Sequence, residues 1–361
     1  MFDLSLESIE SVSIKVNDSS FDSYIKQLKP TAVLFDRFLM EEQFGWRVAE
    51  YSSGSIRILD TEDLQSLRGA RQQAYKENRE FCGDDLDSDL VKREISSIYR
   101  SDLSLIISEF ETGLLKSKFC LNDELIHHTP FMIDSKQLDY STPSFEEREH
   151  FVTIGNLRHA PNWDSILYLQ ELWPSIRKEL PEAELHIYGA YTPPKATALN
   201  NPKMGFFIKD RADDVLAVMK NARLCLSPLR FGAGIKGKFV DAMKVNTPCI
   251  TTSIGSEGMM AEDHWPGAVH DNNEKLVQAA IRLYSNKELW NNMSHRGHRL
   301  LKSKYDSEAI GESLYKKVIY GMENLSKLRK KNFFGQMLQH HHMKSTKFMA
   351  KWIEEKNKTK T

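Results

Sequence analysis

Two glycines and two lysines are grouped where a short apolar run, ending near residue 228, gives way to a predicted helix. They are Gly232, Gly234, Lys236 and Lys238. Glycines let backbone N–H groups come close to a ligand, and the N-terminus of a helix attracts anions. Lysines at that end oppose the helix dipole unless an anion lies between them, so the pair indicates a polyanion such as a diphosphate. The alternative is that the glycines are turn residues and the lysines are solvated.

An acidic side chain, Asp241, follows within the same predicted helix. A carboxylate can accept hydrogen bonds from two hydroxyl groups, which a ribose offers. A second apolar run then leads to another glycine turn, with Ser256, Glu257 and Gly258 in succession. Ligands of parallel α/β sheets bind beyond the carboxyl ends of the strands, where both loops are expected to lie.

Two common phosphate-binding motifs do not account for this segment. The Walker A pattern GxxxxGK[ST] has no match in the sequence. Residues 232–237, GAGIKG, satisfy GxGxxG literally. A nicotinamide site would also require an N-terminal β unit before the motif and a ribose-binding acid about 20 residues after it.

Short apolar runs alternate with helical stretches in both halves of the chain, which predicts parallel sheets built from βαβ units. The predicted strands cover residues 12–16, 31–35, 56–59, 102–107, 124–128, 150–155, 184–189, 205–210, 222–229 and 247–252. Polar residues 134–149 between the two sets indicate a linker. We therefore predict domains over 1–140 and 150–325, followed by a basic helical tail over 326–361.

Composition excludes several classes of protein. The 361 residues carry 49 lysines and arginines against 50 acidic residues, so no global positive field favours nucleic acid. Four scattered cysteines without a CxxC pair exclude a disulfide framework and a zinc motif. No signal peptide and no run of about 18 apolar residues is present, so we expect a cytoplasmic protein.

The tail differs from the rest of the chain in its charge. Residues 327–361 hold ten lysines and arginines against two glutamates, a net charge of +8. One interpretation is a peripheral contact with an anionic surface, and the other is a solvated helix with a frayed end.

The ordered motifs of the second half resemble those of a known family. The stretch 154–189, IGNLRHAPNWDSILYLQELWPSIRKELPEAELHIYG, is similar to the first strand, loop and helix of the donor-binding domain of group 1 glycosyltransferases, also grouped as family 4. The run GAGIKGKFVDAM followed by TPCITTSIGSEG is similar to a form of their donor motif. The resemblance implies the GT-B fold, an α/β architecture of two Rossmann-like domains with a cleft between them.

The resemblance also implies a reaction. A sugar leaves a nucleotide-diphosphate sugar and joins an acceptor with its anomeric configuration retained, and no metal or other cofactor takes part. Lys236 and Lys238 would stabilise the departing diphosphate, and Asp241 would hold the ribose hydroxyls. The backbone at Gly232 and Gly234 would approach the donor closely.

Five further positions are donor contacts by the same resemblance. Gly155 and Arg158 follow the first strand of the domain. Ser256, Glu257 and Gly258 form the second glycine turn, near the diphosphate or the sugar.

The chain departs from the family pattern in two ways that keep other functions open. The first glutamate of the ExxxxxxxE motif is missing, since Ala233 stands there, and Asp241 replaces the second. Nothing in residues 1–30 resembles the glycine-rich opening of the acceptor domain, so we expect this domain to be incomplete. The alternatives are a catalytically inactive nucleotide-sugar-binding or scaffolding paralogue, and a nucleotide-sugar epimerase.

Polar side chains also follow the predicted strands of the first half, at 36–37, 60–63 and 108–109. Strand ends face the interdomain cleft in this architecture, so these residues are candidate acceptor contacts or a general acid or base. Each also suits the start of a helix, where it would act as a cap.

Overall fold

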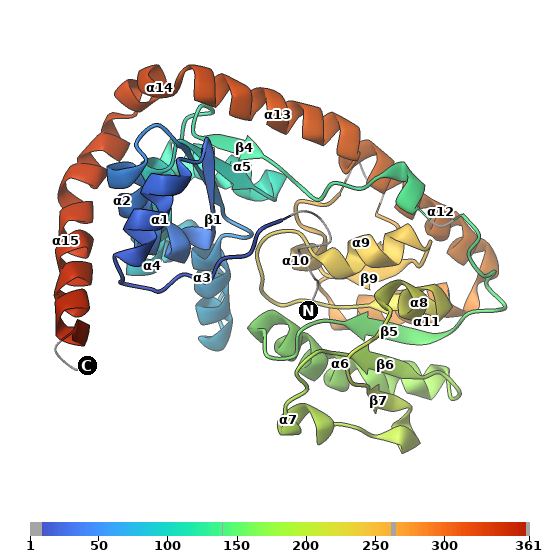
Figure 1. Cartoon of the computed structure of the whole chain (residues 1–361). Helices are drawn as coiled ribbons and strands as arrows, with labels where there is room; N and C mark the ends of the chain where they lie inside the picture. The colour runs from blue at the N-terminus through green and yellow to red at the C-terminus, as the bar shows by residue number, and fades with distance from the viewer. Residues whose placement is uncertain (1–8, 139, 261–264, 359–361) are drawn as a thin grey trace.

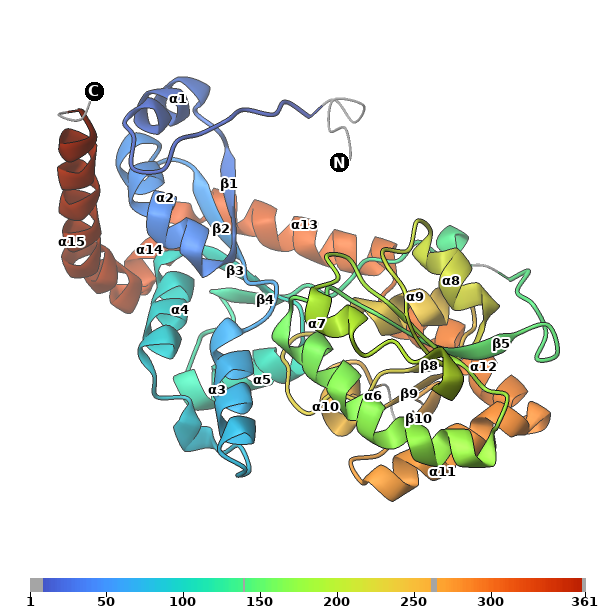
Figure 2. The same cartoon turned by 90° about the horizontal axis from the view of Figure 1, so that it is seen from below.

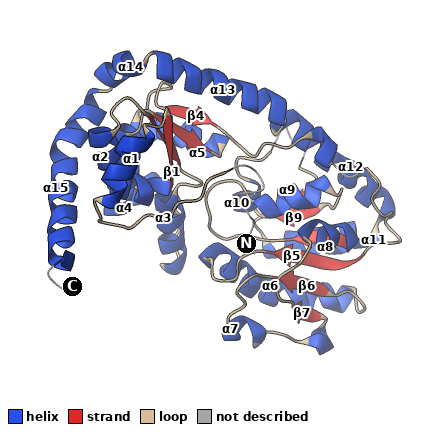
Figure 3. Ribbon diagram, in the orientation of Figure 1, coloured by secondary structure: helices blue, strands red, loops and turns tan. Residues whose placement is uncertain are grey.

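Two parallel sheets, one in each half of the chain, form the central layers of the molecule, and helices surround them (Figures 1 and 3). The computed structural model describes residues 9–138, 140–260 and 265–358. An α/β protein with two such domains was predicted from the sequence, and the fold confirms it. In the described parts of the chain no helix is long and apolar enough to span a membrane.

The first sheet has four parallel strands in the order β1-β2-β3-β4. Their bounds are Ala32–Asp36, Ile56–Asp60, Leu103–Ile106 and Ile126–His128. The helices are α1 Ser20–Leu28, α2 Arg37–Tyr51, α3 Gln65–Lys76, α4 Asp89–Arg100 and α5 Glu109–Phe119, with a short 3-10 helix at Gly83–Asp85. The sheet forms because β2 and β3 are apolar runs that are buried almost throughout, as central parallel strands require.

Residues 12–16 were predicted as a strand, and this prediction was wrong. Val12, Ile14 and Val16 are 42, 43 and 57% exposed, and the segment joins no sheet. The alternating pattern suits a strand, but a strand forms only where a partner satisfies its backbone hydrogen bonds. The neighbouring strand β1 lies at the end of the sheet and pairs only with β2 among the described residues.

The second sheet has six parallel strands in the order β10-β9-β8-β5-β6-β7. Their bounds in chain order are β5 Glu149–Ile154, β6 Leu185–Tyr188, β7 Phe206–Ile208, β8 Ala222–Leu226, β9 Cys249–Thr251 and β10 Gly267–Val269. The chain builds outward from β5 through β7, then returns to the other side of β5 with β8. Ligands of such sheets bind where the strand order reverses, so the loops after β5 and β8 are the expected site.

Helices cover both faces of this sheet. They are α6 Ala160–Glu179, α7 Pro194–Thr197, α8 Val215–Asn221, α9 Gly237–Lys244, α10 Ser253–Ser256, α11 Asn273–Ser285 and α12 Lys287–Lys304, with short 3-10 helices at Ser135–Gln137 and Pro202–Met204. One face of the sheet packs against α6 and α11 around Phe151, and the other packs against α9 and α12 around Val152. Phe151 and Val152 are neighbours in β5 and therefore point to opposite faces of the sheet. Helix α9, whose start carries the two lysines, packs on the face of Val152.

Three C-terminal helices return the chain to the first domain (Figures 1 and 2). They are α13 Ser307–Glu323, α14 Leu325–Lys331 and α15 Phe333–Lys358. Helix α13 runs from the second domain to the first and packs Leu314, Val318 and Met322 against β2 and β3. Helix α15 then lies along the outer side of the first domain, beside α2 and α4.

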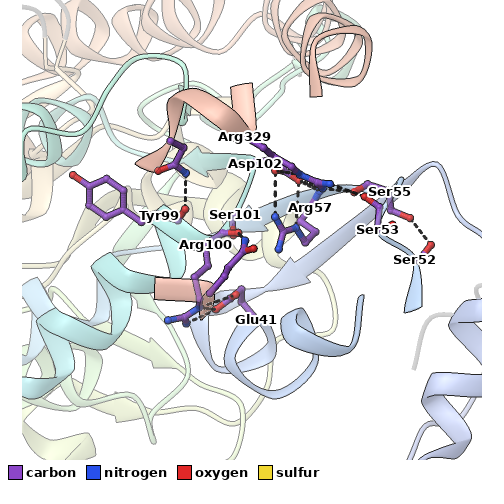
Figure 4. Close-up of polar contacts among 12 residues, drawn as sticks. Glu41, Ser52, Ser53, Ser55, Arg57, Tyr99, Arg100, Ser101, Asp102 and Arg329 are labelled. Carbon is purple, nitrogen blue, oxygen red and sulfur yellow. Dashed lines mark hydrogen bonds and ion pairs between the residues drawn. The ribbon is translucent and has the colours of Figure 1, made fainter. Parts of the chain in front are cut away.

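An arginine secures this return (Figure 4). Arg329 of α14 donates from Nε and Nη2 to the two carboxylate oxygens of Asp102, at 2.8 and 2.7 Å. It also donates to the backbone carbonyls of Ser53 and Ser55, at 2.5 and 2.8 Å. Burial of Asp102 opposes its charge, but Arg329 and Arg57 outweigh that effect and hold the pKa of the carboxyl below its usual value.

Candidate functional site

A cleft of about 650 Å³ lies between the two domains, at the point where the order of the second sheet reverses. The second domain lines it with the loops after β5 and β8 and with the start of α9. The first domain lines it with residues that follow β1 and β2. The polar lining residues are Arg37, Glu62, Asp63, Arg68, His159, Asn162, Lys236, Lys238 and Asp241.

Helix α9 begins at the floor of this cleft without a side-chain cap. Phe239, Val240 and Met243 are buried in the core below it, so the helix is held in one orientation. Its opening residues therefore face the cleft. Lys236 stands at the N-cap position, where Ser, Thr, Asp or Asn is usual, and Lys238 lies in the first turn.

The two lysines, which the sequence predicted to act together, both line the cleft. Lys236 Nζ donates to the carbonyl of Gly234 at 2.8 Å. Lys238 Nζ donates to Asn162 Oδ1 at 2.9 Å and to Ser227 Oγ at 3.1 Å. All three acceptors are uncharged, and within the described part of the chain neither ammonium group pairs with a carboxylate.

Burial without a counter-ion changes the acidity of both lysines. Loss of hydration lowers the pKa of Lys236 to about 8, even though Glu257 and Glu111 favour its charged form from a distance. Burial alone lowers the pKa of Lys238 to about 8 as well. Two such cations at an uncapped helix start form a site to which an anion would bring the missing negative charge.

Asp241 lies on α9, one turn beyond Gly237, and its carboxyl is about one-third exposed to the cleft. Burial raises its pKa, and Lys244, whose Nζ is 4.0 Å away, partly opposes this. The carboxylate accepts no short hydrogen bond within the described residues. It is therefore available to hydroxyl groups of a ligand in the cleft.

The glycines of the first loop are held by the opposite domain. Gly234 has φ +63°, and a side chain there would lie 2.9 Å from Cβ of Asp63. Its N–H donates to Glu111 Oε1 at 2.7 Å, so this amide is not open to a ligand. The carbonyl of Gly232 accepts a hydrogen bond from Arg71 Nη1 at 2.9 Å. Both glycines line the cleft, but their close backbone approach is to the first domain.

The second glycine turn does not line the cleft, and it contacts the first domain. Ser256 is buried, and its hydroxyl donates to backbone carbonyls of its own turn. The carboxylate of Glu257 pairs with both terminal nitrogens of Arg71, at 2.7 and 2.8 Å. Gly258 has φ +73°, and a side chain there would lie 2.3 Å from Ser108 Oγ.

The two predicted residues after β5 are in different environments. Gly155 lines the cleft, and a Cβ at this position would collide with the side chain of Asn162 at 2.6 Å. Arg158 is exposed, and its guanidinium lies 5.0 Å from the ring centroid of Tyr191. Arg158 is not among the residues that line the cleft.

Sequence reasoning missed Asn162, Arg71 and Glu111. Asn162 lies eight residues after the end of β5, in the first turn of α6, and this turn brings its side chain to Lys238. Arg71 and Glu111 lie inside α3 and α5, and only the docking of the two domains brings them to the glycine loops. No local motif marks either position.

Glu111 joins the two domains through backbone hydrogen bonds. Its Oε1 accepts from the N–H of Leu64 at 3.1 Å and from the N–H of Gly234 at 2.7 Å. Burial raises the pKa of this carboxyl to about 7, although the two N–H donors favour its charged form. The group therefore titrates near neutral pH at the domain interface.

Among the described residues no group of three or more His, Cys, Asp and Glu side chains is arranged to hold a metal ion. The four cysteines are free thiols, of which Cys225 and Cys249 are buried in the second sheet.

Comparison with known proteins finds a family model that matches part of the second half of the chain. Residues 148–286 match the model of the family described as glycosyl transferases group 1. An uncharacterized 44.6 kDa protein in the cps region of Klebsiella pneumoniae is 27% identical over 234 residues, which are 62% of this chain and 58% of that protein. The chain thus spans a little over half the length of this relative.

Solved structures share a fold that extends over most of this chain. A TarM variant from S. aureus, crystallised with Fondaparinux, alpha-GlcNAc-glycerol and UDP, has a TM-score of 0.64 and 14% identity, over 82% of this chain and 57% of its own. The pneumococcal O-GlcNAc transferase GtfA, in complex with UDP and GlcNAc, has a TM-score of 0.61 and 16% identity, over 84% and 59%. At these identities the likeness concerns the fold, which is GT-B.

Proposed function

We propose that this protein transfers a sugar from a nucleotide-diphosphate sugar to an acceptor bound in the interdomain cleft. The match of residues 148–286 to the model of group 1 glycosyl transferases supports this proposal. The anomeric configuration would be retained, as the resemblance to the retaining members implies. The UDP in the TarM and GtfA complexes supports a nucleoside diphosphate as the common part of the donor.

The lysine pair at the start of α9 is the observation that carries this proposal. Lys236 and Lys238 are partly buried, have only uncharged acceptors and meet an uncapped helix start. A diphosphate placed there would pair with both ammonium groups and accept from the first N–H groups of the helix. A surface lysine pair would instead be hydrated and would keep its ordinary pKa.

The chemistry of transfer would use the same charges. As the bond from the sugar to the diphosphate breaks, negative charge grows on the departing phosphate oxygens. Lys236, Lys238 and the N-terminus of α9 are fixed before the reaction begins, so they would stabilise that charge without reorganisation. This is the role that a divalent cation would otherwise fill, and the proposed reaction therefore needs none. Asp241 would accept hydrogen bonds from the ribose hydroxyls.

The first domain would supply the acceptor side of the cleft. Arg37 directly follows β1 and Glu62 lies two residues after β2, and both adopt left-handed backbone conformations, with φ +65° and +60°. Such conformations are costly for residues with side chains and persist where the surrounding structure requires them. Asp63 and Arg68 pair with each other beside them. These groups offer donors and acceptors for a hydroxylated acceptor.

Replacement of Lys238 by Met tests the donor site, because it removes the charge and keeps most of the volume. Affinity for UDP, or for the nucleoside diphosphate that binds best, is expected to fall about 10- to 100-fold in calorimetric titration. Lys178→Met is the matched control, since Lys178 is exposed at the far end of α6. Equal affinity in Lys238→Met and the wild type would remove Lys238 from the site.

Turnover assays separate the enzyme from the two alternatives. Transfer of the sugar to an acceptor is the outcome that we expect. Saturable binding without any turnover would favour a nucleotide-sugar-binding or scaffolding protein. Conversion of the free nucleotide sugar to an isomer in the absence of an acceptor would favour an epimerase.

The basic tail supports a further contact within this proposal. Phe348, Met349 and Trp352 of α15 are 65, 57 and 58% exposed, and the exposed Lys351 and Lys356 lie on the same helix. Exposed aromatic and cationic side chains of this kind suit an anionic lipid surface. Co-sedimentation with anionic vesicles but not with neutral ones would support the contact, and equal sedimentation with both would contradict it.

A further inference from the structure

Arg71 of α3 reaches from the first domain to both glycine loops of the second. Its Nη1 donates to the carbonyl of Gly232 at 2.9 Å and to Glu257 Oε1 at 2.7 Å. Its Nη2 donates to Glu257 Oε2 at 2.8 Å. One guanidinium thus fixes the loop after β8 and the turn after β9 at the same time.

The surroundings of Arg71 make this contact specific. Its side chain is only 7% exposed, and that of Glu257 is 15% exposed. The guanidinium lies 5.4 Å from the ring centroid of Phe81 and 5.2 Å from that of Phe110. A buried charge in this position is tolerated only because the planar guanidinium meets a carboxylate in a two-point pair. Lysine cannot reproduce that geometry.

The loops that Arg71 holds are the loops that carry the proposed donor contacts. Lys236 lies four residues after Gly232 and is hydrogen-bonded to the carbonyl of Gly234. Glu111 restrains the N–H of Gly234 from the same side. The core of the second domain holds α9 itself, but these restraints on the loop that leads to Lys236 come from the first domain.

We propose that Arg71 is a positioning residue for the donor: through Gly232 and Glu257 it sets the glycine loops so that Lys236 and the start of α9 can bind a diphosphate. This inference rests on the proposed donor site and assigns to the first domain a part in building it. Arg71 does not touch the donor in this role. Its effect is exerted through Glu257 and the backbone.

A first test measures the loops in the free protein, without any ligand. Hydrogen exchange of peptides that cover residues 230–237 and 253–260 is expected to become faster in Arg71→Lys, while peptides from β5 remain unchanged. Arg93→Lys is the matched control, because Arg93 forms an exposed two-point pair with Glu42 within the first domain. Unchanged exchange of both loops in Arg71→Lys would overturn the positioning role.

The second test measures donor binding and turnover in the same variants. Arg71→Lys is expected to weaken UDP binding about tenfold and to raise the KM for the donor, with the KM for the acceptor unchanged. A double-mutant cycle combines Arg71→Met with Glu257→Gln. The double variant is expected to bind UDP no more weakly than the single variant with the lower affinity, because each substitution removes the same Arg71–Glu257 contact.

The outcomes distinguish this inference from the proposed function. If the wild type binds UDP and the Arg71 variants bind it equally well, the positioning role is wrong and the donor site stands. If the wild type binds no nucleoside diphosphate at all, both fail. A loss of folding in Arg71→Met, with normal binding and exchange in Arg71→Lys, would show a purely structural residue and would overturn the inference.

Discussion

Lys236 and Lys238 are buried and pair with no carboxylate in the described part of the chain, and this combination explains both their acidity and their proposed role. Loss of hydration lowers the pKa of each ammonium to about 8. A bound anion would restore the charged state and raise both values. Binding of a diphosphate above pH 8 must therefore be accompanied by proton uptake.

This linkage predicts the pH dependence of binding. Below pH 8 both lysines of the free protein carry protons, and affinity for UDP depends little on their titration. As the pH rises through 8 the free protein loses these protons, so affinity is expected to fall, by about 100-fold between pH 7 and pH 9 if both groups contact the ligand. Titration calorimetry in two buffers of different ionisation enthalpy measures both the affinity and the proton uptake.

The Lys238→Met variant is the control for this profile. With one titrating group left, the fall between pH 7 and pH 9 is expected to be about tenfold. A flat profile in the wild type would contradict the proposed contact between the ligand and the two ammonium groups.

Residue types and spacing predicted part of this site. The lysine pair and Asp241 were found from their place at a predicted helix start, and the structure brings all three to one cleft. Arg71 and Glu111 were not found, because each acts across a domain interface whose geometry no local pattern contains. The glycines were predicted to let the backbone approach a ligand, whereas in the structure the N–H of Gly234 donates to Glu111.

At the scale of elements, the sequence predicted buried parallel strands well where apolar runs are continuous. Strands β2, β3 and β8 are of this kind. Residues 12–16 have a pattern that suits a strand, but no described strand pairs with them, and a sequence pattern does not show whether such a partner exists. Strand β10 was missed for the opposite reason: Gly267–Val269 is too short to stand out, and it exists because β9 offers it hydrogen bonds.

The return of the C-terminal helices is secured by a charge as well as by apolar packing. Arg329 holds α14 to Asp102 and to two backbone carbonyls that follow α2. Asp102 is nearly buried, with 4% of its side chain exposed, so its charge depends on its two arginines. Removal of Arg329 leaves it with Arg57, whose backbone N–H donates at 2.9 Å but whose guanidinium contacts are longer, at 3.4 Å.

We therefore expect Arg329→Ala to lower the free energy of unfolding by about 2–3 kcal/mol, because buried hydrogen bonds to a charged group are lost. Urea denaturation followed by circular dichroism measures the change. Lys327→Ala on the same helix is the control and is expected to lie within about 0.5 kcal/mol of the wild type. A similar small effect for Arg329→Ala would show that apolar packing of α13 alone holds the helices in place.

In the whole molecule, both domains line the cleft that holds the proposed site. The second sheet places its loops at the strand-order reversal, and the first domain fixes those loops through Arg71 and Glu111. The proposed acceptor groups follow β1 and β2 on the facing wall. Closure of the domains would exclude water from the donor, which a transferase needs in order to avoid hydrolysis.

The two-domain architecture was predictable because alternation of strands and helices constrains topology strongly. Only the resemblance to a known family predicted how the two domains are oriented relative to each other, with a cleft between them. The interdomain contacts at Gly234 and Gly258 were not predictable at all, since they depend on side chains more than 120 residues away.

Calorimetric titration of the wild-type protein with UDP, GDP and ADP, with and without EDTA, shows whether the cleft binds a nucleoside diphosphate without a metal ion. We expect saturable binding of at least one of them, with an affinity that EDTA does not change, because Lys236, Lys238 and the start of α9 supply the positive charge. Failure of a folded protein to bind any of the three, or binding that EDTA abolishes, would contradict this expectation.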